Sequence, residues 1–391
     1  MFEAGGVTPP GGRVLLVQRR LTHYRAPFFE RLRTALAQRG MSLTLALGRA
    51  DAAEAQRDDA ADLPWATTVP TRQWAQGRAV WQSLGPLSSQ ADLVVLPQEN
   101  RLLSNAPLLL RPHRLRVALW GHGRDLQADT GWKAQCAQAW KAQLTRRADW
   151  WLAYTARSAA EFGAIGCPPQ RITTVNNAVD TTALAAEVAE LRRADLSGLR
   201  QSLGLTTEPV LLFLGSLTAG RRLDLVLATA QLVRATCPGL QLVIAGTGTA
   251  AAQVQAWAQG VPGVHCVGAV HGLRKQQWLA CADALLMPTQ LGLGLLDAMA
   301  SGVPLVTTTA AGHGPEIAYL QSGHNGLAVA PDAEALAQAS LAVLRQPDLA
   351  ARLREGGLRT AATHTLDAMV QRFADGLQAW RDAPRRGATG G

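Results

Sequence analysis

Residues 284–308, ALLMPTQLGLGLLDAMASGVPLVTT, carry the clearest structural signal in the chain. The apolar run 284–287 predicts a buried strand, and residues 304–307 predict a second one. Between them, two glycines open a segment with helical periodicity that ends at the Ser301-Gly302 turn. A strand, a helix and a strand in that order predict a parallel pair of strands with a crossover helix. This stretch therefore indicates an α/β fold.

The same alternation extends outward over the whole chain. Short runs rich in Val and Leu, bounded by polar turns, alternate with longer stretches of helical periodicity. The expected strands of the first half are 14–17, 43–47, 93–96, 117–120 and 151–154. Those of the second half are 210–214, 240–245, 264–267, 284–287 and 304–307. The sequence thus predicts two doubly wound parallel sheets.

The length of 391 residues is too great for one ordinary hydrophobic core. We expect an N-terminal Rossmann-like domain over residues 12–185 and a C-terminal one over residues 186–361. The stretch 180–208 has no strand signal, so we place the hinge there and the cleft between the lobes. A helix over about 362–383 is expected to pack back on the first domain. The first helix should begin at Pro27, which suits a first helical position, and end near Gly40.

Composition describes a folded protein, with 48% apolar and 17% charged residues. No window approaches the ~20 apolar residues that span a bilayer, and the amino terminus lacks the pattern of a signal peptide. A cytoplasmic protein is expected. The five cysteines are widely spaced, with no pair at metal-ligand or redox spacing, and we interpret them as reduced apolar fillers.

The formal charge of +9 is concentrated in the first half of the chain. Between Arg13 and Arg39 there are seven arginines and a single acid, Glu30. Such a patch suits an anionic membrane surface, a lipid phosphate or nucleic acid, and the alternative is a solvated face. Because motifs that mix aromatic and basic residues are missing, nucleic acid is not an expected partner. The expectation is a protein that can attach peripherally to the inner face of the membrane.

Two arginines follow an expected strand in residues 211–233, LLFLGSLTAGRRLDLVLATAQLV. Loops at the carboxyl ends of parallel strands collect ligands, and helix amino termini attract phosphate. A guanidinium at Arg221 or Arg222 can bind a pyrophosphate in bidentate fashion. The alternative is a pair of solvated loop arginines.

Two further loops have the same placement. Glycines at 292 and 294 let backbone amides approach a ligand closely, and Asp297 could accept hydrogen bonds from ribose hydroxyls. In VALWGHGRDLQ, residues 117–127, His122 stands between two glycines after a strand. This histidine could contact a sugar hydroxyl or share a proton with a leaving phosphate. The alternatives are a structural turn and a structural histidine.

Together these segments resemble the retaining glycosyltransferases of family four, which have the GT-B fold of two Rossmann-like domains facing a cleft. The resemblance runs roughly from residue 13 to residue 330. Two more segments support it. YTARSAAEFGAIGCPPQRITTVNNAVD, residues 154–180, is similar to a family segment that ends in Asn-Gly-Val-Asp, with Asn177 and Asp180 matching. AGHGPEIAYLQSGHNGLAV, residues 311–329, is similar to the family's Gly-Gly-x-x-Glu-Ile and Gly-x-Asn-Gly run.

The resemblance implies a donor site mostly in the second domain and an acceptor site mostly in the first. Arg221 takes the place of the lysine that binds donor phosphates, and Asp297 that of the second glutamate of the Glu-x7-Glu motif, which binds ribose. His122 matches the first-domain histidine near the transferred sugar, so His122 and Arg221 are the expected catalytic residues. The other expected donor-binding residues are Gly215, Ser216, Arg222, Thr289, Gly292, Leu293, Gly294 and Leu295.

The sequence departs from the family pattern at two positions. The first glutamate of the motif falls at Thr289, and the phosphate-binding arginine falls at Ser216. Sugar and phosphate contacts are therefore expected to be redistributed, with Arg222 as a candidate. A variant branch of the family with Gly-Leu in this loop and no first glutamate looks similar.

The function implied is transfer of a hexosyl group from a UDP-sugar to a cell-envelope glycan or a lipid-linked acceptor. No metal ion and no further cofactor is expected, since cationic side chains and a helix terminus take the place of Mg²⁺. The loop His23, Tyr24 and Arg25 is expected to bind the acceptor, and the alternative is that Arg25 caps local structure. Rival interpretations are a nucleotide-sugar epimerase and a catalytically silent partner that binds a nucleotide-sugar or a membrane.

Overall fold

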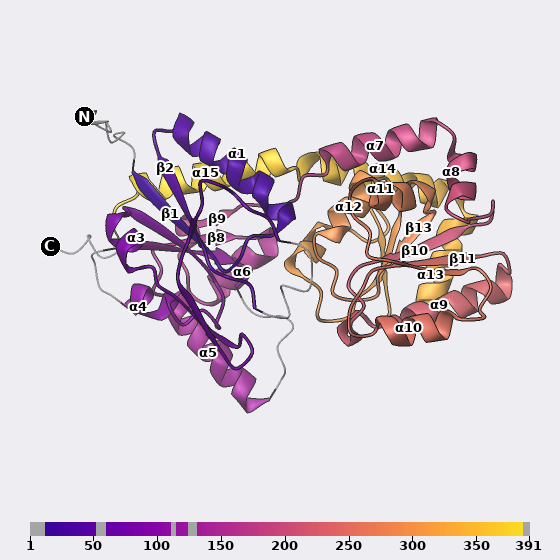
Figure 1. Ribbon diagram of the computed structural model, residues 1–391, viewed down its shortest axis with the longest axis horizontal. Coiled ribbons are helices and arrows are strands. Elements are labelled where there is room, and N and C mark those ends of the chain that lie inside the picture. The colour runs from indigo at the N-terminus through magenta and orange to yellow at the C-terminus, as the bar shows by residue number, and fades with distance from the viewer. Residues whose placement is uncertain (1–11, 52–59, 111–114, 124–130, 386–391) are drawn as a thin grey trace. The chain divides into compact units, whose positions relative to one another are not determined.

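The computed structural model of the protein describes residues 12–51, 60–110, 115–123 and 131–385 (Figure 1). The chain divides into two compact units, one of Met1–Val179 with Leu366–Gly391 and one of Asp180–Thr365. The boundary expected between residues 185 and 186 lies inside α7 (Thr182–Arg193). Because α7 packs on α11 (Gly272–Cys281), the whole helix belongs to the second unit.

The first unit is built on a seven-stranded parallel sheet in the order β3-β2-β1-β6-β7-β8-β9. Its strands are β1 (Arg13–Gln18), β2 (Ser42–Leu47), β3 (Thr67–Thr68), β6 (Leu93–Pro97), β7 (Arg116–Gly121), β8 (Trp150–Ala153) and β9 (Ile172–Thr174). An antiparallel hairpin of β4 (Thr71–Trp74) and β5 (Ala79–Gln82) lies apart from this sheet. All five strands expected in the first half are present, whereas β3, β9 and the hairpin were not predicted.

Helices of the first unit include one from the far end of the chain. They are α1 (Ala26–Gln38), α3 (Gly85–Gln90), α4 (Asn105–Leu110), α5 (Trp132–Thr145), α6 (Ala156–Ala164) and α15 (Leu366–Asp382), with short 3-10 turns η1 (His23–Arg25) and η2 (Pro169–Arg171). Helix α1 has proline in its first turn, as predicted, and buries Phe28 against Phe373 of α15 with ring centroids 5.3 Å apart. Ion pairs of Arg31 with Asp367 and Arg39 with Asp375 add to this contact.

The second unit is built on a six-stranded parallel sheet in the order β12-β11-β10-β13-β14-β15. Its strands are β10 (Val210–Leu214), β11 (Gln241–Ala245), β12 (Val264–Gly268), β13 (Ala284–Leu286), β14 (Leu305–Thr308) and β15 (Leu327–Val329). The remaining helices are α8 (Leu196–Ser202), α9 (Leu223–Thr236), α10 (Ala251–Ala258), α12 (Gly294–Ala300), α13 (Ala333–Arg345) and α14 (Pro347–Thr363), with turns η3 (Ala219–Arg221) and η4 (Pro315–Tyr319). The predicted pair of doubly wound parallel sheets is confirmed.

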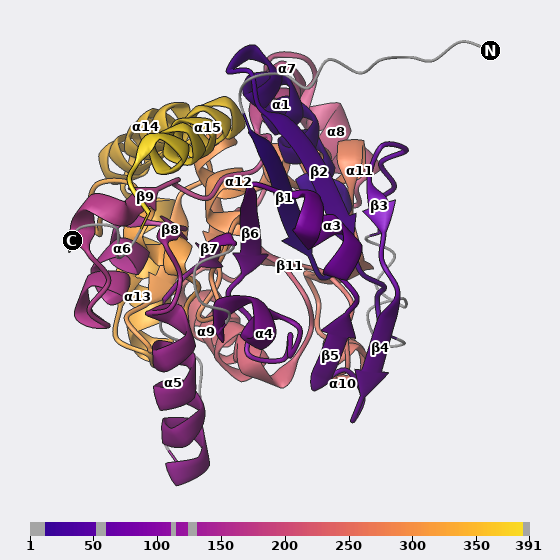
Figure 2. The same cartoon turned by 90° about the vertical axis from the view of Figure 1, so that its left-hand side faces the viewer.

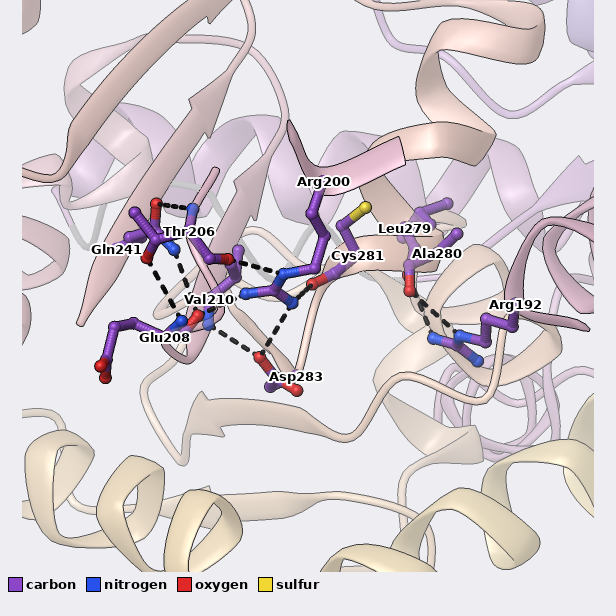
Figure 3. A network of polar contacts seen from close by, with 10 residues as sticks. All are labelled: Arg192, Arg200, Thr206, Glu208, Val210, Gln241, Leu279, Ala280, Cys281 and Asp283. Carbon is purple, nitrogen blue, oxygen red and sulfur yellow. Dashed lines mark hydrogen bonds and ion pairs between the residues drawn. The ribbon is translucent and has the colours of Figure 1, made fainter. Parts of the chain in front are cut away.

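Two arginines fasten the first helices of the second unit to its sheet (Figure 3). Arg192 of α7 donates to the carbonyls of Leu279 and Ala280 at 3.1 Å each and to that of Ser301 at 2.6 Å. Arg200 of α8 donates to the carbonyl of Cys281 at 3.2 Å. Because Leu279, Ala280 and Cys281 end α11 just before β13, the contacts with their carbonyls fix where that strand enters the sheet. The contact with Ser301 ties α7 to the end of α12.

The cysteines differ in their surroundings. Cys167 and Cys281 are buried, whereas Cys136 and Cys266 are exposed. The interpretation of all five as apolar fillers is therefore wrong for the exposed pair. In the described part of the chain, no helix is both long enough and apolar enough to cross a bilayer.

Candidate functional site

The expected donor-binding residues of the second unit lie in loops that follow two adjacent strands of its sheet. Strand β10 pairs with β11 on one side and with β13 on the other, so the strand order reverses between β10 and β13. Ligands of doubly wound sheets bind at such a reversal, beyond the carboxyl ends of the strands. The loop after β10 carries Gly215–Arg222, and the loop after β13 carries Thr289–Leu295. The two loops therefore frame one candidate site.

Arg221 joins these two loops. Its Nη1 donates to the carbonyl of Gln290 at 2.6 Å, and its Nε donates to Ser216 Oγ at 3.4 Å. The guanidinium lies over Gly215, where an added Cβ would stand 3.7 Å from Arg221 Cζ. Burial lowers the pKa of Arg221, yet a guanidinium stays charged at neutral pH. Among the described residues no carboxylate pairs with it. The charge of this half-buried guanidinium is therefore suited to binding an anion.

Arg222 is arranged differently from its neighbour. It adopts a left-handed conformation (φ 51°) at the start of α9. Its exposed side chain makes an ion pair with Asp224 at 2.7 Å, which raises the pKa of Arg222 chiefly through the hydrogen bond. The carboxylate already satisfies this guanidinium, so Arg222 is less suited than Arg221 to hold a phosphate.

The loop after β13 is held from both sides. Thr289 is buried and donates from Oγ1 to the carbonyl of Gly220 at 2.7 Å. Gln290 has a φ of 52°, and a Cβ at Gly220 would clash with its side-chain amide. The Thr289 hydroxyl thus holds this loop against η3.

His313 fixes the residue just before the glycines. Its Nδ1 accepts from the amide of Leu291 at 3.2 Å, and its Nε2 lies 2.9 Å from the carbonyl of Thr308. Since that carbonyl can only accept, Nε2 carries the proton and Nδ1 is the acceptor. Gly314 donates its amide to the carbonyl of Leu291 at 2.7 Å. Both backbone groups of Leu291 are therefore held by one short segment.

Backbone amides follow directly after this clamp. Among the described residues, the amides of Gly292, Leu293 and Gly294 have no hydrogen-bond acceptor. The amide of Leu295 donates to the carbonyl of Gly292 at 3.0 Å, and the Leu295 side chain is fully buried. The Leu295 amide is therefore used by the first turn of the helix. The other three amides stay available.

Asp297 has a partner that the sequence did not reveal. Lys275 of α11 lies with its Nζ 2.8 Å from Asp297 Oδ2, and the two side chains are 25% and 16% exposed. An ion pair of this kind limits the rotation of the Asp297 carboxylate. The carboxylate can still accept a hydrogen bond from a hydroxyl group, such as one of a ribose.

In the first unit, His122 follows β7 directly and sits in a loop held by Gln98. Buried Gln98 accepts from the amide of Gly123 at 2.8 Å and donates to Thr145 Oγ1 at 2.8 Å. Gly123 has a φ of 80°, and a Cβ there would stand 2.8 Å from Glu161 Cβ, so glycine is required. Gln98 and Gly123 thus fix the backbone of the loop that carries His122.

The three expected acceptor residues make up η1, which follows β1. Arg25 donates from Nη2 to Asn177 Oδ1 at 2.7 Å, and its guanidinium lies 5.5 Å from the Tyr24 ring and 5.4 Å from the Trp120 ring. These contacts fit the alternative in which Arg25 braces local structure. Buried Nη1 has no hydrogen-bond partner in the described part of the chain, which leaves one donor for a ligand.

Aromatic rings connect η1 with His122. Trp120 lies 5.7 Å from Tyr154, and Tyr154 lies 6.2 Å from His122, as measured between ring centroids. His23 packs its ring 5.9 Å from that of Tyr24. Since Arg25 stacks on Trp120, the structure brings the predicted histidine and the predicted acceptor loop into one cluster. Tyr154 and Gln98 were missed by the sequence analysis, although each lies at the carboxyl end of a strand that it predicted.

The arginine-rich stretch of residues 13–39 is not an open cationic surface. Acids distant in sequence pair with four of its seven arginines: Arg13 with Asp92, Arg19 with Glu99, Arg31 with Asp367 and Arg39 with Asp375. Arg33 lies over the Trp65 ring at 4.7 Å. The local excess of charge expected from the sequence is therefore largely compensated in the folded chain.

Metal ligands do not gather in the described residues, where no group of three or more His, Cys, Asp or Glu could hold an ion. The donor site instead offers one guanidinium and three amides.

Both units match models of known protein families. Residues 28–183 match the Glycosyltransferase Family 4 model, and residues 208–346 match the Glycosyl transferases group 1 model. The chain is a glycosyltransferase of the family 4, group 1 type. The two matches fall on the two parallel-sheet units that frame the candidate sites.

Individual relatives agree with this assignment. A phosphatidyl-myo-inositol mannosyltransferase from Propionibacterium freudenreichii subsp. shermanii is 34% identical over 103 residues, which span only a quarter of each chain. The structure of HepE from Anabaena in complex with UDP-glucose covers 94% of this glycosyltransferase and 99% of HepE, with a TM-score of 0.65 and 17% identity. The structure of a glycosyltransferase from Rickettsia africae has a TM-score of 0.69 and 12% identity, and the match covers 96% of this chain and 100% of that one. The structural likenesses confirm the GT-B fold.

Proposed function

We propose that this glycosyltransferase transfers a hexosyl group from a nucleoside diphosphate sugar, with UDP-sugars as the expected donors, to a cell-envelope glycan or a lipid-linked acceptor. The anomeric configuration is retained. The donor binds at the β10–β13 edge of the second unit, and the acceptor binds near η1 of the first.

One observation carries this proposal: Arg221 is half-buried, charged and without a carboxylate partner among the described residues, and it donates to the carbonyl of Gln290 in the loop that leads to three unused amides. A cation and peptide N–H groups in a partly desolvated place are suited to a diphosphate. They stabilise the leaving group most when its charge is greatest, in the transition state.

The chemistry follows from that arrangement. The bond between the anomeric carbon and the diphosphate oxygen breaks, and negative charge accumulates on the diphosphate. The acceptor hydroxyl then bonds to the same face of the anomeric carbon, and its proton passes to the departing phosphate oxygen. Asp297 accepts hydrogen bonds from the ribose, and His122 contacts the transferred sugar. Arg221 and the amides take the place of a divalent cation.

The relatives' names support the choice of substrates. The mannosyltransferase is named for a phosphatidylinositol acceptor, which favours a lipid-linked acceptor here. HepE was solved with UDP-glucose, which favours a UDP-sugar donor. A lipid acceptor would bring the protein to the inner face of the membrane as a peripheral protein.

The test is calorimetry of the purified full chain with UDP-glucose, UDP-galactose, GDP-mannose and ADP-glucose. We expect one of them to bind. Arg221→Met should weaken that binding by about tenfold or more, because a charge-assisted hydrogen bond contributes about 1.5–3 kcal/mol. Arg193→Met removes an exposed arginine of the same unit and should change nothing. Folded protein that binds none of these donors would contradict the proposal.

Product analysis separates the rival functions. Transfer requires an acceptor, whereas an epimerase converts the donor alone. A protein that binds the donor and forms no product with any lipid or glycan acceptor would be a silent partner.

A further inference from the structure

Exposed aromatic side chains are concentrated in the first unit. In the described part of the chain, all four exposed tryptophans lie there: Trp74, Trp81, Trp132 and Trp140. Leu103 and Leu110, also exposed, lie between them in the chain. We call these six residues the tryptophan surface. Large exposed apolar side chains mark a site of interaction more often than single scattered ones do.

The hairpin presents two of the tryptophans on one face. Arg72 stands opposite Trp81, and Trp74 stands opposite Ala79, in the antiparallel register. Residues opposite each other share a face, as do residues two apart along a strand. Arg72, Trp74 and Trp81 therefore lie on the exposed face of the hairpin, while Val80 points inward and is buried.

The elements that carry these six residues are neighbours in the fold. Leu103 donates its amide to the carbonyl of Val80 at 2.9 Å, and Leu102 forms a bridge with Val80, so this segment extends the hairpin. Helix α4 starts two residues later and packs on α5. Figure 2 shows the hairpin, α4 and α5 following one another along one side of the unit.

Helix α5 adds a tryptophan face of its own. Trp132 and Trp140 are 71% and 54% exposed, and eight residues separate them. That spacing puts both on the same side of the helix, ~12 Å apart along its axis. Among the residues of α5 whose burial is described, Lys141, directly after Trp140, is the first that is buried, and the helix contains no acidic residue.

The stretch of sequence that carries these tryptophans is rich in basic residues. Residues 71–147 contain eleven Lys and Arg and only four Asp and Glu. Arg72, Arg78 and Arg147 are exposed, and none of them forms an ion pair within the described residues. Asp92 and Glu99, in contrast, are both engaged by arginines. The surface thus combines aromatic rings with unpaired cations.

We propose that the tryptophan surface docks the first unit on an anionic lipid bilayer. Tryptophan favours the interface between lipid headgroups and acyl chains, and nearby Lys and Arg are attracted to anionic headgroups. Charge complementarity selects this occupant over a second copy of the chain, because two such surfaces would place like charges together. The arginines of residues 13–39 are less suited, since most of them already have partners.

This inference rests on the proposed function and deepens it, since docking would bring the enzyme to the membrane that holds a lipid-linked acceptor. Its test needs no turnover. The full chain is sedimented with vesicles of phosphatidylcholine alone or with 40 mol% phosphatidylglycerol, at low and high salt. We expect binding to the anionic vesicles that salt weakens, and little binding to the neutral ones.

Variants locate the contact. Trp132→Ser with Trp140→Ser should weaken the vesicle partition by about tenfold or more, since both large apolar side chains are lost. Arg72→Gln with Arg78→Gln should weaken it by about fivefold for each arginine. Leu273→Ser with Leu358→Ser removes two exposed leucines of the second unit and should change nothing.

Three results would overturn the inference. One is intact protein that does not bind anionic vesicles, and another is tryptophan variants that bind as well as the parent. The third is that the parent protein is a dimer and the tryptophan variant is a monomer that still binds vesicles. That result would assign the surface to self-association. Donor calorimetry on the same tryptophan variant should match the parent, so a failure of docking is distinguishable from a failure of the proposed transferase.

Discussion

Lys275 Nζ lies 2.8 Å from Asp297 Oδ2, and this ion pair joins α11 to α12 beside the candidate donor site. Both side chains are mostly buried, so each charge depends on the other for the interactions that water would otherwise supply. Lys275 therefore acts on Asp297 as a positioning residue, by holding the carboxylate in one orientation.

Removal of the lysine should affect stability and donor binding together. Lys275→Met leaves the Asp297 charge without its partner, and we expect the free energy of unfolding to fall by about 1–3 kcal/mol and donor affinity to fall as well. Asp297→Asn keeps a carbonyl oxygen for ribose and relieves the unpaired charge. The double variant should be less destabilised than the sum of the single ones, as measured by denaturant unfolding. Strict additivity would argue against the pairing.

His313 should control the shape of the glycine loop. His313→Leu removes the acceptor for the Leu291 amide and leaves a buried N–H unsatisfied, which should cost about 1–3 kcal/mol of stability and weaken donor binding. His313→Asn can place its Oδ1 where Nδ1 now lies and should recover part of both. Calorimetry and thermal unfolding of the pair test this. If the asparagine variant is as impaired as the leucine variant, the hydrogen bond to Leu291 is not what matters.

The strands that sequence predicted are those with long apolar runs, such as β10 and β11, whose residues are nearly all buried. The missed ones are short or half-exposed. Thr67–Thr68 is exposed at both positions, Ile172–Thr174 and Leu327–Val329 are only partly buried, and β4 alternates. Edge strands of two or three residues carry too little periodicity to be recognised from the chain alone.

Site residues divide in the same way. Those that directly follow a buried strand, such as Arg221 and His122, are visible in sequence because parallel strands end at one edge of the sheet. Their partners are set by tertiary packing. Lys275 precedes Asp297 by 22 residues and lies on another helix, and Gln98 reaches Gly123 across 25 residues. No local pattern marks such pairs, so only the folded structure reveals them.

Arg25 tests the acceptor site. Its contacts with Asn177 and Trp120 brace η1, while buried Nη1 is left for a ligand. Arg25→Gln should raise the KM for a lipid-linked acceptor by about tenfold or more and leave donor affinity within a factor of about two, because a charged donor group is lost. Arg49→Gln, an exposed arginine of the same unit, is the control. An unchanged KM, with stability alone reduced, would assign Arg25 to local structure.

Metal removal should leave transfer intact. In the proposed mechanism, Arg221 and the amides of residues 292–294 supply the positive charge that a divalent ion would bring. The rate in excess chelator should therefore stay within a factor of about two of that in Mg²⁺. The measurement is transfer from whichever donor binds. A rate that collapses in chelator and returns with added Mg²⁺ would contradict this account of the leaving group.

Cys281 should make stability depend on alkaline pH. Burial raises the pKa of its thiol from 9.0 to about 11. Well below pH 9 the thiol is protonated in both the folded and the unfolded chain and contributes no pH dependence. Between pH 9 and about 11 the unfolded chain loses this proton while the folded chain keeps it, so the free energy of unfolding falls as pH rises.

Replacement of the thiol isolates this effect. Cys281→Ala should show a shallower decline of unfolding free energy between pH 9 and pH 11 than the parent, whereas Cys136→Ala, which changes an exposed cysteine, should follow the parent. An aromatic disulfide reagent should label Cys136 in the folded protein and reach Cys281 only after unfolding, because burial shields that thiol and keeps it protonated. Rapid labelling of Cys281 at pH 8 in folded protein would show that the buried environment inferred for it is wrong.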